Sequence, residues 1–420
     1  MSYTIQKKTE KELNRIYEYD LPVHDWYRFV LSFPPHLVRN YIKEFKLNAD
    51  SCLFDPFCGT GTTLVEAKKL GIKSIGFEAN PVVHMCASTK VNWSLPCDIV
   101  LHEARQIAKK AQYEIDNSSQ DLTLDQEKLK LLIKNSISPI PLHKTLNLIR
   151  AIESYDSKYN DFYKTALAKE AVVSYSNLKF SPEVGVCKKK VLDVDVVNLW
   201  LNQIEKMLED LNDNKCNKDI SSYVFLADSR LDLNKIPDNS IDAVITSPPY
   251  PNEKDYSRTT RLESVLLNFI KDKDDLRTIK KSLLRSNSKG VYKGDDDYIW
   301  IADNITVNNL ANTIETTRIK LGKTSGFEKL YHKVVRLYFG GMARHLYNLR
   351  PKLKDGAKLA YVVGDQYSYF KTPIKTGNIL AEIAQNLGYA VIKKDLFRKR
   401  MSTVTKDNIN EEVLVLEYRK

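Results

Sequence analysis

The sequence predicts an α/β fold with a largely parallel sheet, and three observations support that prediction. Short apolar runs rich in β-branched residues alternate with stretches whose apolar residues recur at helical spacing. A glycine-rich turn follows the first run, and an acidic residue closes the second. Two long segments interrupt the alternation, so we expect two largely helical insertions. The expected strands are Ser51–Asp55, Lys73–Glu78, Tyr223–Ala227, Ile241–Thr246, Lys358–Gly364 and Val413–Tyr418.

The composition is that of a globular protein, and its positive charge is compatible with a polyanionic partner without establishing one. Lys and Arg number 64 against 53 acids, which gives a net charge of +11. No apolar run approaches the ~18 residues that a membrane span needs, and the charged N-terminus lacks an apolar leader. We therefore expect a cytoplasmic protein that does not enter a membrane. The 6 cysteines form no Cys-x-x-Cys pair, so we expect neither a metal site nor a disulfide framework.

Two insertions separate the expected strands. Residues 82–220 read as mostly helical, because Leu199–Leu211 and other stretches carry apolar residues at helical spacing. Residues 257–329 include a run, residues 276–294, that contains bases but no acid. Such a run is ordinarily a solvated face, although its interleaved Ser, Asn and Gly also favour phosphate contacts. The sheet domain is then expected to comprise residues 1–81, 221–256 and 330–420.

The glycine-rich turn lies in Ser51–Thr63, which reads as a strand, a tight turn and the start of a helix. Gly59 and Gly61 let the backbone approach a ligand closely, and the helix N-terminus points its amides at the same place. Leu64 replaces the third glycine of a dinucleotide-binding turn. One strand later, Glu78 stands where a carboxylate accepts hydrogen bonds from two ribose hydroxyls. The pattern indicates a nucleoside site, although Glu78 alone would be an ordinary surface acid.

A second motif, Ser247-Pro-Pro-Tyr250, follows the apolar strand Ile241–Thr246. Its two prolines fix a rigid turn at the carboxyl end of the strand, where α/β sheets bind ligands. An exocyclic amine on a base is a poor nucleophile, because its lone pair is delocalised into the ring. The Ser247 hydroxyl and the Pro248 carbonyl can accept its two N–H groups and stabilise developing positive charge. Tyr250 can stack on a base rotated out of the duplex, although an isolated motif of this kind is also a capped strand end.

These motifs resemble those of the amino-methylating DNA methyltransferases. Asp55–Thr63 is similar to the S-adenosylmethionine-binding motif of that family, and His24–Val38 resembles the segment that packs beside the cofactor. The resemblance implies a Rossmann-like, seven-stranded methyltransferase sheet that binds S-adenosyl-L-methionine. The expected cofactor-binding residues are Asp55, Pro56, Phe57, Cys58, Gly59, Thr60, Gly61, Thr62, Thr63, Glu78 and Asp228, of which Asp228 would accept from the adenine amine. The expected catalytic residues are Ser247, Pro248, Pro249 and Tyr250.

The first residue of the catalytic motif bears on the target base. In this family Ser is more typical of cytosine N4 methylation, and Asp or Asn of adenine N6 methylation. We expect N4 methylation of a flipped-out cytosine in duplex DNA, with adenine N6 as the alternative, in a restriction–modification system that has a cognate endonuclease. Target reading is expected in the first insertion, with Ser174–Phe180 and Lys188–Lys190, and Arg398–Arg400 are either phosphate contacts or a surface cluster. The expected DNA-binding residues are Arg258, Lys280, Lys281, Arg285, Lys188 and Lys189.

Other classes are less favoured. A carbon-5 cytosine enzyme needs a Cys nucleophile after Pro in the catalytic loop, and Pro96-Cys97 lies in a helical stretch instead. An RNA amine methyltransferase shares both motifs, but usually carries an RNA-binding domain before the cofactor loop. A DNA-binding subunit without activity would not need both motifs intact. A small-molecule enzyme would need neither the positive charge nor the insertions.

Overall fold

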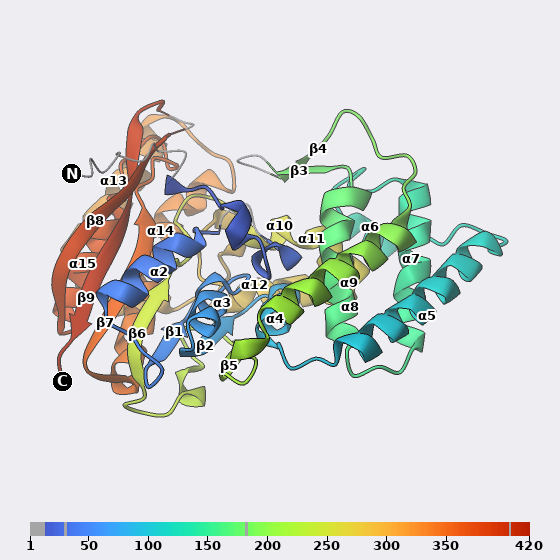
Figure 1. The fold of residues 1–420 in the computed structure, drawn as a ribbon. Helices are drawn as coiled ribbons and strands as arrows, with labels where there is room; N and C mark the ends of the chain where they lie inside the picture. Colours follow the sequence, from blue (N-terminus) through green and yellow to red (C-terminus); the bar gives the residue numbers. More distant parts are fainter. Residues whose placement is uncertain (1–12, 29–31, 181–183, 403–404) are drawn as a thin grey trace, which may run out of the picture.

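The computed structural model describes residues 13–28, 32–180, 184–402 and 405–420, which form a sheet-containing lobe and a helical lobe (Figure 1). The first lobe holds a seven-stranded sheet in the order β5-β2-β1-β6-β7-β9-β8. The first five of these strands are parallel, and β9 runs antiparallel to both β7 and β8. This confirms the predicted seven-stranded Rossmann-like fold. The strands are β1 Cys52–Asp55, β2 Lys73–Glu78, β5 Ser222–Leu226, β6 Ile241–Thr246, β7 Leu353–Gly364, β8 Tyr389–Met401 and β9 Asn408–Tyr418.

Both faces of the sheet are covered, which explains why its central strands are apolar throughout. On one face Leu53, Ala243 and Val362 pack against α2 and α3. On the other face Phe54 and Val244 pack with α14 and α15. The helices of this lobe are α2 Pro35–Glu44, α3 Thr62–Lys69, α13 Ile305–Lys320, α14 Tyr331–Leu349 and α15 Thr376–Asn386, with the 3₁₀ turn η7 Asp297–Ile301.

The first insertion forms most of the helical lobe. Its long helices surround a core that includes Trp200, Tyr163 and Ile204. A short hairpin, β3 and β4, stands above them in Figure 1. The elements are α4 Pro81–Val91, α5 Cys97–Asp116, α6 Gln126–Leu131, α7 Pro139–Ser154, α8 Asn160–Glu170, a π-helical turn Ala171–Tyr175, β3 Leu178–Phe180, β4 Val184–Val186 and α9 Val196–Asp213.

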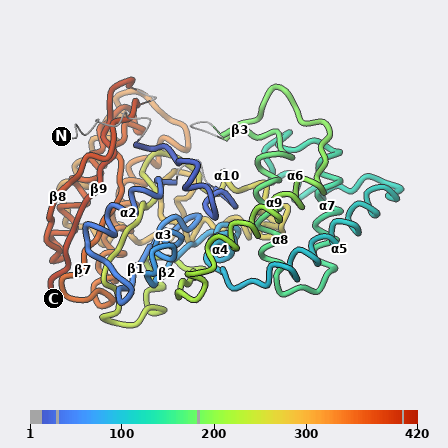
Figure 2. The backbone as a smooth tube through the Cα atoms, in the orientation of Figure 1, coloured from blue at the N-terminus to red at the C-terminus, as the bar shows by residue number. Residues whose placement is uncertain are grey.

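The second insertion is divided between the two lobes. Helices α10 Tyr256–Thr259, α11 Arg261–Leu266 and α12 Lys273–Ser282 add Leu262, Val265 and Ile279 to the core of the helical lobe. The chain then returns to the sheet-containing lobe, where Leu284 and Ile301 join the core around α14. The tube in Figure 2 shows α10 between the two lobes. The basic run at residues 276–294 therefore crosses the junction.

No described helix is both long and apolar enough to span a membrane. Within the same residues, no group of three or more His, Cys, Asp and Glu side chains is placed to hold a metal ion.

Candidate active site

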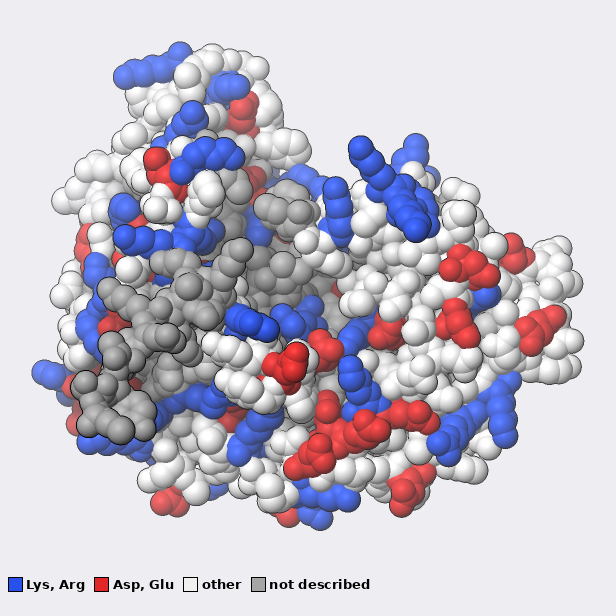
Figure 3. Space-filling view, turned by 45° about the horizontal axis from the view of Figure 1, so that its top comes forward, with Lys and Arg blue, Asp and Glu red and all other residues white. Residues whose placement is uncertain are grey.

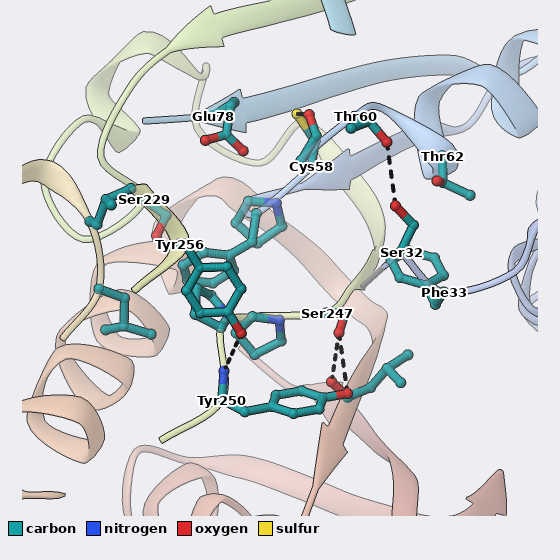
Figure 4. A pocket seen from close by; sticks show the side chains of 18 of the residues that line it. Ser32, Phe33, Cys58, Thr60, Thr62, Glu78, Ser229, Ser247, Tyr250 and Tyr256 are labelled. Carbon is teal, nitrogen blue, oxygen red and sulfur yellow. Dashed lines mark hydrogen bonds between the residues drawn. The ribbon is translucent and has the colours of Figure 1, made fainter. Parts of the chain in front are cut away.

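A cavity opens at the carboxyl ends of β1, β2 and β6, beside the junction of the lobes. The glycine-rich turn and the end of β2 form one side, and the Ser-Pro-Pro-Tyr turn forms the other (Figure 4). Residues from the N-terminal segment and the last two strands complete the wall. The lining residues include Asn14, Ser32, Phe33, Pro56–Thr60, Thr62, Glu78–Asn80, Ala227, Ser229, Ser247–Tyr250, Asn252, Lys254, Tyr256, Val362, Arg398, Arg400 and Glu411.

The glycine-rich turn needs its glycines because the backbone takes positive φ values, 51° at Gly59 and 83° at Gly61. Pro56, Phe57, Cys58, Gly59, Thr60 and Thr62 line the cavity, whereas Asp55, Gly61 and Thr63 support the turn from behind. The buried Asp55 carboxylate accepts from Thr246 Oγ1 at 2.6 Å and from the Phe57 amide at 3.1 Å. Thr63 Oγ1 donates to the Ile245 carbonyl at 3.2 Å. Asp55 and Thr63 therefore join the glycine-rich turn to β6, the strand that carries the second motif.

The N-terminal segment lies against this turn. The buried Lys90 ammonium donates to the carbonyls of His24, at 2.9 Å, and Tyr27, and the Tyr27 hydroxyl donates to Glu263. Burial lowers the pKa of Lys90 to about 7. Farther along, Ser32 Oγ lies 3.5 Å from Thr60 Oγ1 (Figure 4). The segment is thus tied to α4 and α11 before it reaches the cavity.

Glu78 points into the cavity from the end of β2 (Figure 4). Its Oε1 accepts a hydrogen bond from the backbone N–H of Asn80 at 2.7 Å, and burial raises the pKa of the Glu78 carboxyl to about 7. Asn80 also lines the cavity, and its Oδ1 is buried without a hydrogen-bond partner among the described residues. These two side chains supply acceptors for the hydroxyl and N–H groups of a ligand.

Because Glu78 is the expected acceptor for the cofactor ribose, its raised pKa predicts that cofactor affinity depends on pH. Only the carboxylate accepts from two hydroxyls, so affinity should be full above about pH 7. As the pH falls through the pKa, the carboxyl becomes protonated, and affinity should drop by up to about tenfold per pH unit. Calorimetric titration with S-adenosylhomocysteine between pH 5.5 and 8.5 measures this. Glu78→Gln should bind weakly and with little pH dependence, and a wild-type affinity that is constant over this range would contradict the assignment.

Asp228 does not stand where the sequence predicted. Its carboxylate is turned to Arg230, whose Nε and Nη2 donate at 2.9 Å and 2.6 Å, and that guanidinium also pairs with Asp297. Its neighbours Ala227 and Ser229 line the cavity instead. The expected contact from Asp228 to the cofactor adenine does not fit this arrangement, because both carboxylate oxygens are already bonded to a buried cation.

The Ser-Pro-Pro-Tyr turn presents its hydroxyls at the cavity wall. Ser247 Oγ lies 3.2 Å from the Val362 carbonyl and 3.5 Å from the Tyr250 hydroxyl, and it donates towards these two oxygens. The lone pairs of Ser247 are therefore left for a group in the cavity. The Tyr250 amide donates to the Tyr256 hydroxyl at 3.2 Å (Figure 4).

Three charged residues among the described cavity lining come from the terminal hairpin, the pair of strands β8 and β9. Arg398 and Arg400 lie on β8, and Glu411 lies opposite Arg398 on β9. The sequence offered no signal for Glu411, and Arg398–Arg400 had the two interpretations given above. The sequence could have indicated this arrangement if residues 389–401 had been predicted as a strand. Pairing that strand with the last one would have placed Arg398 and Arg400 near Glu411.

The predicted DNA-binding residues fall into two groups. Lys188, Lys189 and Lys281 are exposed, and Arg258 is half-buried. Lys280 is paired with Asp255 at 2.8 Å. Arg285 is buried with 5% of its side chain exposed, and its guanidinium is bonded to Asp295. Arg285 therefore cannot reach a phosphate as predicted, because its charge is already neutralised inside the protein.

Lys and Arg side chains gather on both sides of the hollow between the lobes (Figure 3). Acidic side chains are concentrated on the lower right of the same view. This distribution places positive charge beside the hollow, where a polyanion would be attracted.

The sheet order and the position of the cavity are those of a Rossmann-like methyltransferase fold. A family model described as DNA methylase matches residues 2–88. The type II methyltransferase M.BsoBI of Geobacillus stearothermophilus is 29% identical over 422 residues, 90% of this chain and 81% of that protein. The type II methyltransferase M.AvaI of a Nostoc strain is 23% identical over 406 residues, 89% and 80% of the two chains. These similarities support the amino-methylating DNA methyltransferase family that the motifs predicted.

One solved structure also resembles the chain. It is TrmN from Thermus thermophilus, at 9% identity and a TM-score of 0.28, covering 91% of this chain and 48% of that one.

Proposed function

We propose that the protein transfers a methyl group from S-adenosyl-L-methionine to the N4 amine of cytosine in duplex DNA. We further propose that it is the modification enzyme of a type II restriction–modification system. The observation that most supports this reaction is the direction of the Ser247 hydroxyl. It donates towards the Val362 carbonyl and the Tyr250 hydroxyl, so its lone pairs can accept from an amine. The type II relatives support the setting in restriction–modification.

The cavity residues fit the cofactor. The Glu78 carboxylate would accept from two ribose hydroxyls, and Asn80 Oδ1, which has no hydrogen-bond partner among the described residues, would accept from an N–H donor. Gly59 has open space where a side chain would stand, so the backbone can meet a ligand closely. When bound, the cofactor supplies an electrophilic methyl group on a sulfonium.

Ser247 and Pro248 would orient the amine of the flipped base. Their oxygens accept its two N–H bonds, which draws the nitrogen lone pair towards the methyl group and stabilises positive charge on nitrogen. The N–C bond then forms as the S–C bond breaks, and the nitrogen loses a proton to water. Tyr250 would stack on the base and hold the amine in line. No covalent bond to the protein is needed.

Labelled-methyl transfer tests the proposed substrate class. The purified protein is incubated with methyl-labelled cofactor and either mixed-sequence duplex DNA or bulk tRNA. We expect label in the DNA alone. Label confined to tRNA would move the protein to the RNA amine methyltransferases and would overturn the proposal.

The exposed Lys281 is proposed to contact the DNA backbone, because Ser282 to Leu284 beside it line the cavity mouth. Lys281→Ala should weaken DNA binding and reduce the slope of log K against log salt by about 1. Fluorescence anisotropy at several salt concentrations measures the slope. The control is Lys73→Ala, because Lys73 is exposed at the amino end of β2, on the opposite edge of the sheet. An equal slope for Lys281→Ala and the wild type would show that Lys281 is an ordinary solvated side chain that does not contact the DNA backbone.

A further inference from the structure

The terminal hairpin holds the tyrosine of the Ser-Pro-Pro-Tyr turn. The Tyr250 hydroxyl donates to Glu411 Oε1 at 2.9 Å. The other oxygen of Glu411 accepts from Arg398 Nε, so the buried carboxylate is bonded on both sides. Glu411 follows Tyr250 by 161 residues in the sequence. The contact therefore depends on the pairing of β9 with β7 and not on the local sequence.

Arg400 supports the same side chain. Its guanidinium carbon lies 5.8 Å from the centre of the Tyr250 ring, and Nη2 donates to the Asp365 carbonyl at 3.0 Å. A cation against an aromatic ring attracts it and fixes its plane. Glu411 and Arg400 thus determine both the hydroxyl direction and the ring orientation of Tyr250.

The directions of the hydroxyl protons follow from the chemistry of Glu411. An ionised carboxylate only accepts, so the Tyr250 hydroxyl must donate to it. The Tyr250 oxygen is then an acceptor for Ser247 Oγ, 3.5 Å away, and the Val362 carbonyl is a second acceptor at 3.2 Å. The hydroxyl protons of Tyr250 and Ser247 are thus both directed to oxygen acceptors of the protein. A serine that could also donate is thereby kept as an acceptor.

We infer that Glu411 is a positioning residue for methyl transfer, acting through the Tyr250 hydroxyl to keep Ser247 an acceptor for the base amine. The inference rests on the proposed function. It explains how a neutral serine performs the task for which other members of the family use an acidic or amide side chain. Arg398 and Arg400 hold the carboxylate and the ring in place.

A double-mutant cycle of Glu411→Gln and Tyr250→Phe tests this role. Glutamine keeps the shape but can donate to the tyrosine, so the proton directions are no longer fixed. Glu411→Gln should lower kcat for DNA methylation about tenfold, since a hydrogen bond to a charged group is at stake, with the affinity for S-adenosylhomocysteine unchanged within about twofold. In the Tyr250→Phe background the same change should have almost no further effect on kcat.

The control is Glu417→Gln on the same strand, because Glu417 is also paired with an arginine, Arg419, at 2.8 Å but lies at the far end of β9. It should leave kcat unchanged. Equal losses from Glu411→Gln in the two backgrounds, or an undiminished kcat, would overturn the inference while wild-type methylation of DNA upholds the proposed function. Failure of the wild type to methylate DNA would refute the proposed function instead.

A second measurement tests the hydrogen bond without activity. The ¹³Cζ NMR signal of Tyr250, assigned by its loss in Tyr250→Phe, reports the bonding of the hydroxyl. Glu411→Gln should shift this signal and Glu417→Gln should not. A signal that does not move in Glu411→Gln would show that the carboxylate does not hold the tyrosine.

Discussion

Ser247→Ala should lower kcat for DNA methylation by about a hundredfold or more and leave the cofactor affinity within about twofold of the wild type. The hydroxyl oxygen is one of two acceptors proposed for the reacting amine, and removing one group that stabilises transition-state charge typically costs this much. In the wild type the hydrogen bond to the Val362 carbonyl holds the Ser247 hydroxyl in one position. Alanine has no hydroxyl, so the variant loses this acceptor. Single-turnover methylation with saturating DNA measures the chemical step.

The matched control for this change is Ser240→Ala. Ser240 precedes the same strand, β6, at its opposite end, and its hydroxyl donates to the Pro237 carbonyl at 2.7 Å. It should methylate DNA at the wild-type rate, and both variants should keep the wild-type melting temperature. Undiminished turnover in Ser247→Ala would refute the assignment of Ser247 to the active site.

Gly340→Ala should lower the free energy of unfolding by about 3 kcal/mol. Gly340 lies in α14, and a Cβ there would stand 1.9 Å from the Asp297 carbonyl oxygen of η7. Because the obstructing atom belongs to backbone, helix and turn must move apart. Asp297 pairs with Arg230 next to the cavity residue Ser229, so cofactor affinity should fall as well.

Urea denaturation and cofactor titration measure the two effects of Gly340→Ala. Gly326→Ala is the control, because an added Cβ there meets nothing within 4 Å. It should change the free energy of unfolding by less than about 0.5 kcal/mol. A Gly340→Ala variant as stable as Gly326→Ala would contradict the close approach of α14 to η7.

The central strands were predictable because their apolar runs reflect burial on both faces. The strand β8 was not, since Lys393, Lys394, Asp395, Arg398, Lys399 and Arg400 give it no apolar run. It lies at the edge of the sheet, where charged side chains are tolerated and even protective. Only its antiparallel pairing with β9 makes it a strand.

Within the site, the two contiguous motifs were predictable because each is a short turn at the end of a strand. Glu411 and Arg400 were not, because they reach the cavity only through the pairing of distant strands. Asp228 and Arg285 were predicted to bind ligands, but the structure pairs each of them with an opposite charge inside the protein. A charged residue in a sequence does not reveal whether a partner such as Arg230 or Asp295 already neutralises it.

The most direct test of the central claim is the identity of the methylated base. The protein is expressed in a host whose DNA lacks N4-methylcytosine, and the DNA is digested to nucleosides and identified by mass, with Ser247→Ala expressed in parallel. We expect N4-methylcytosine with the wild type and none with Ser247→Ala. N6-methyladenine would refute the choice of base while keeping the mechanism. A methyl group on carbon 5, or equal N4 methylation by Ser247→Ala, would contradict amine methylation by this site.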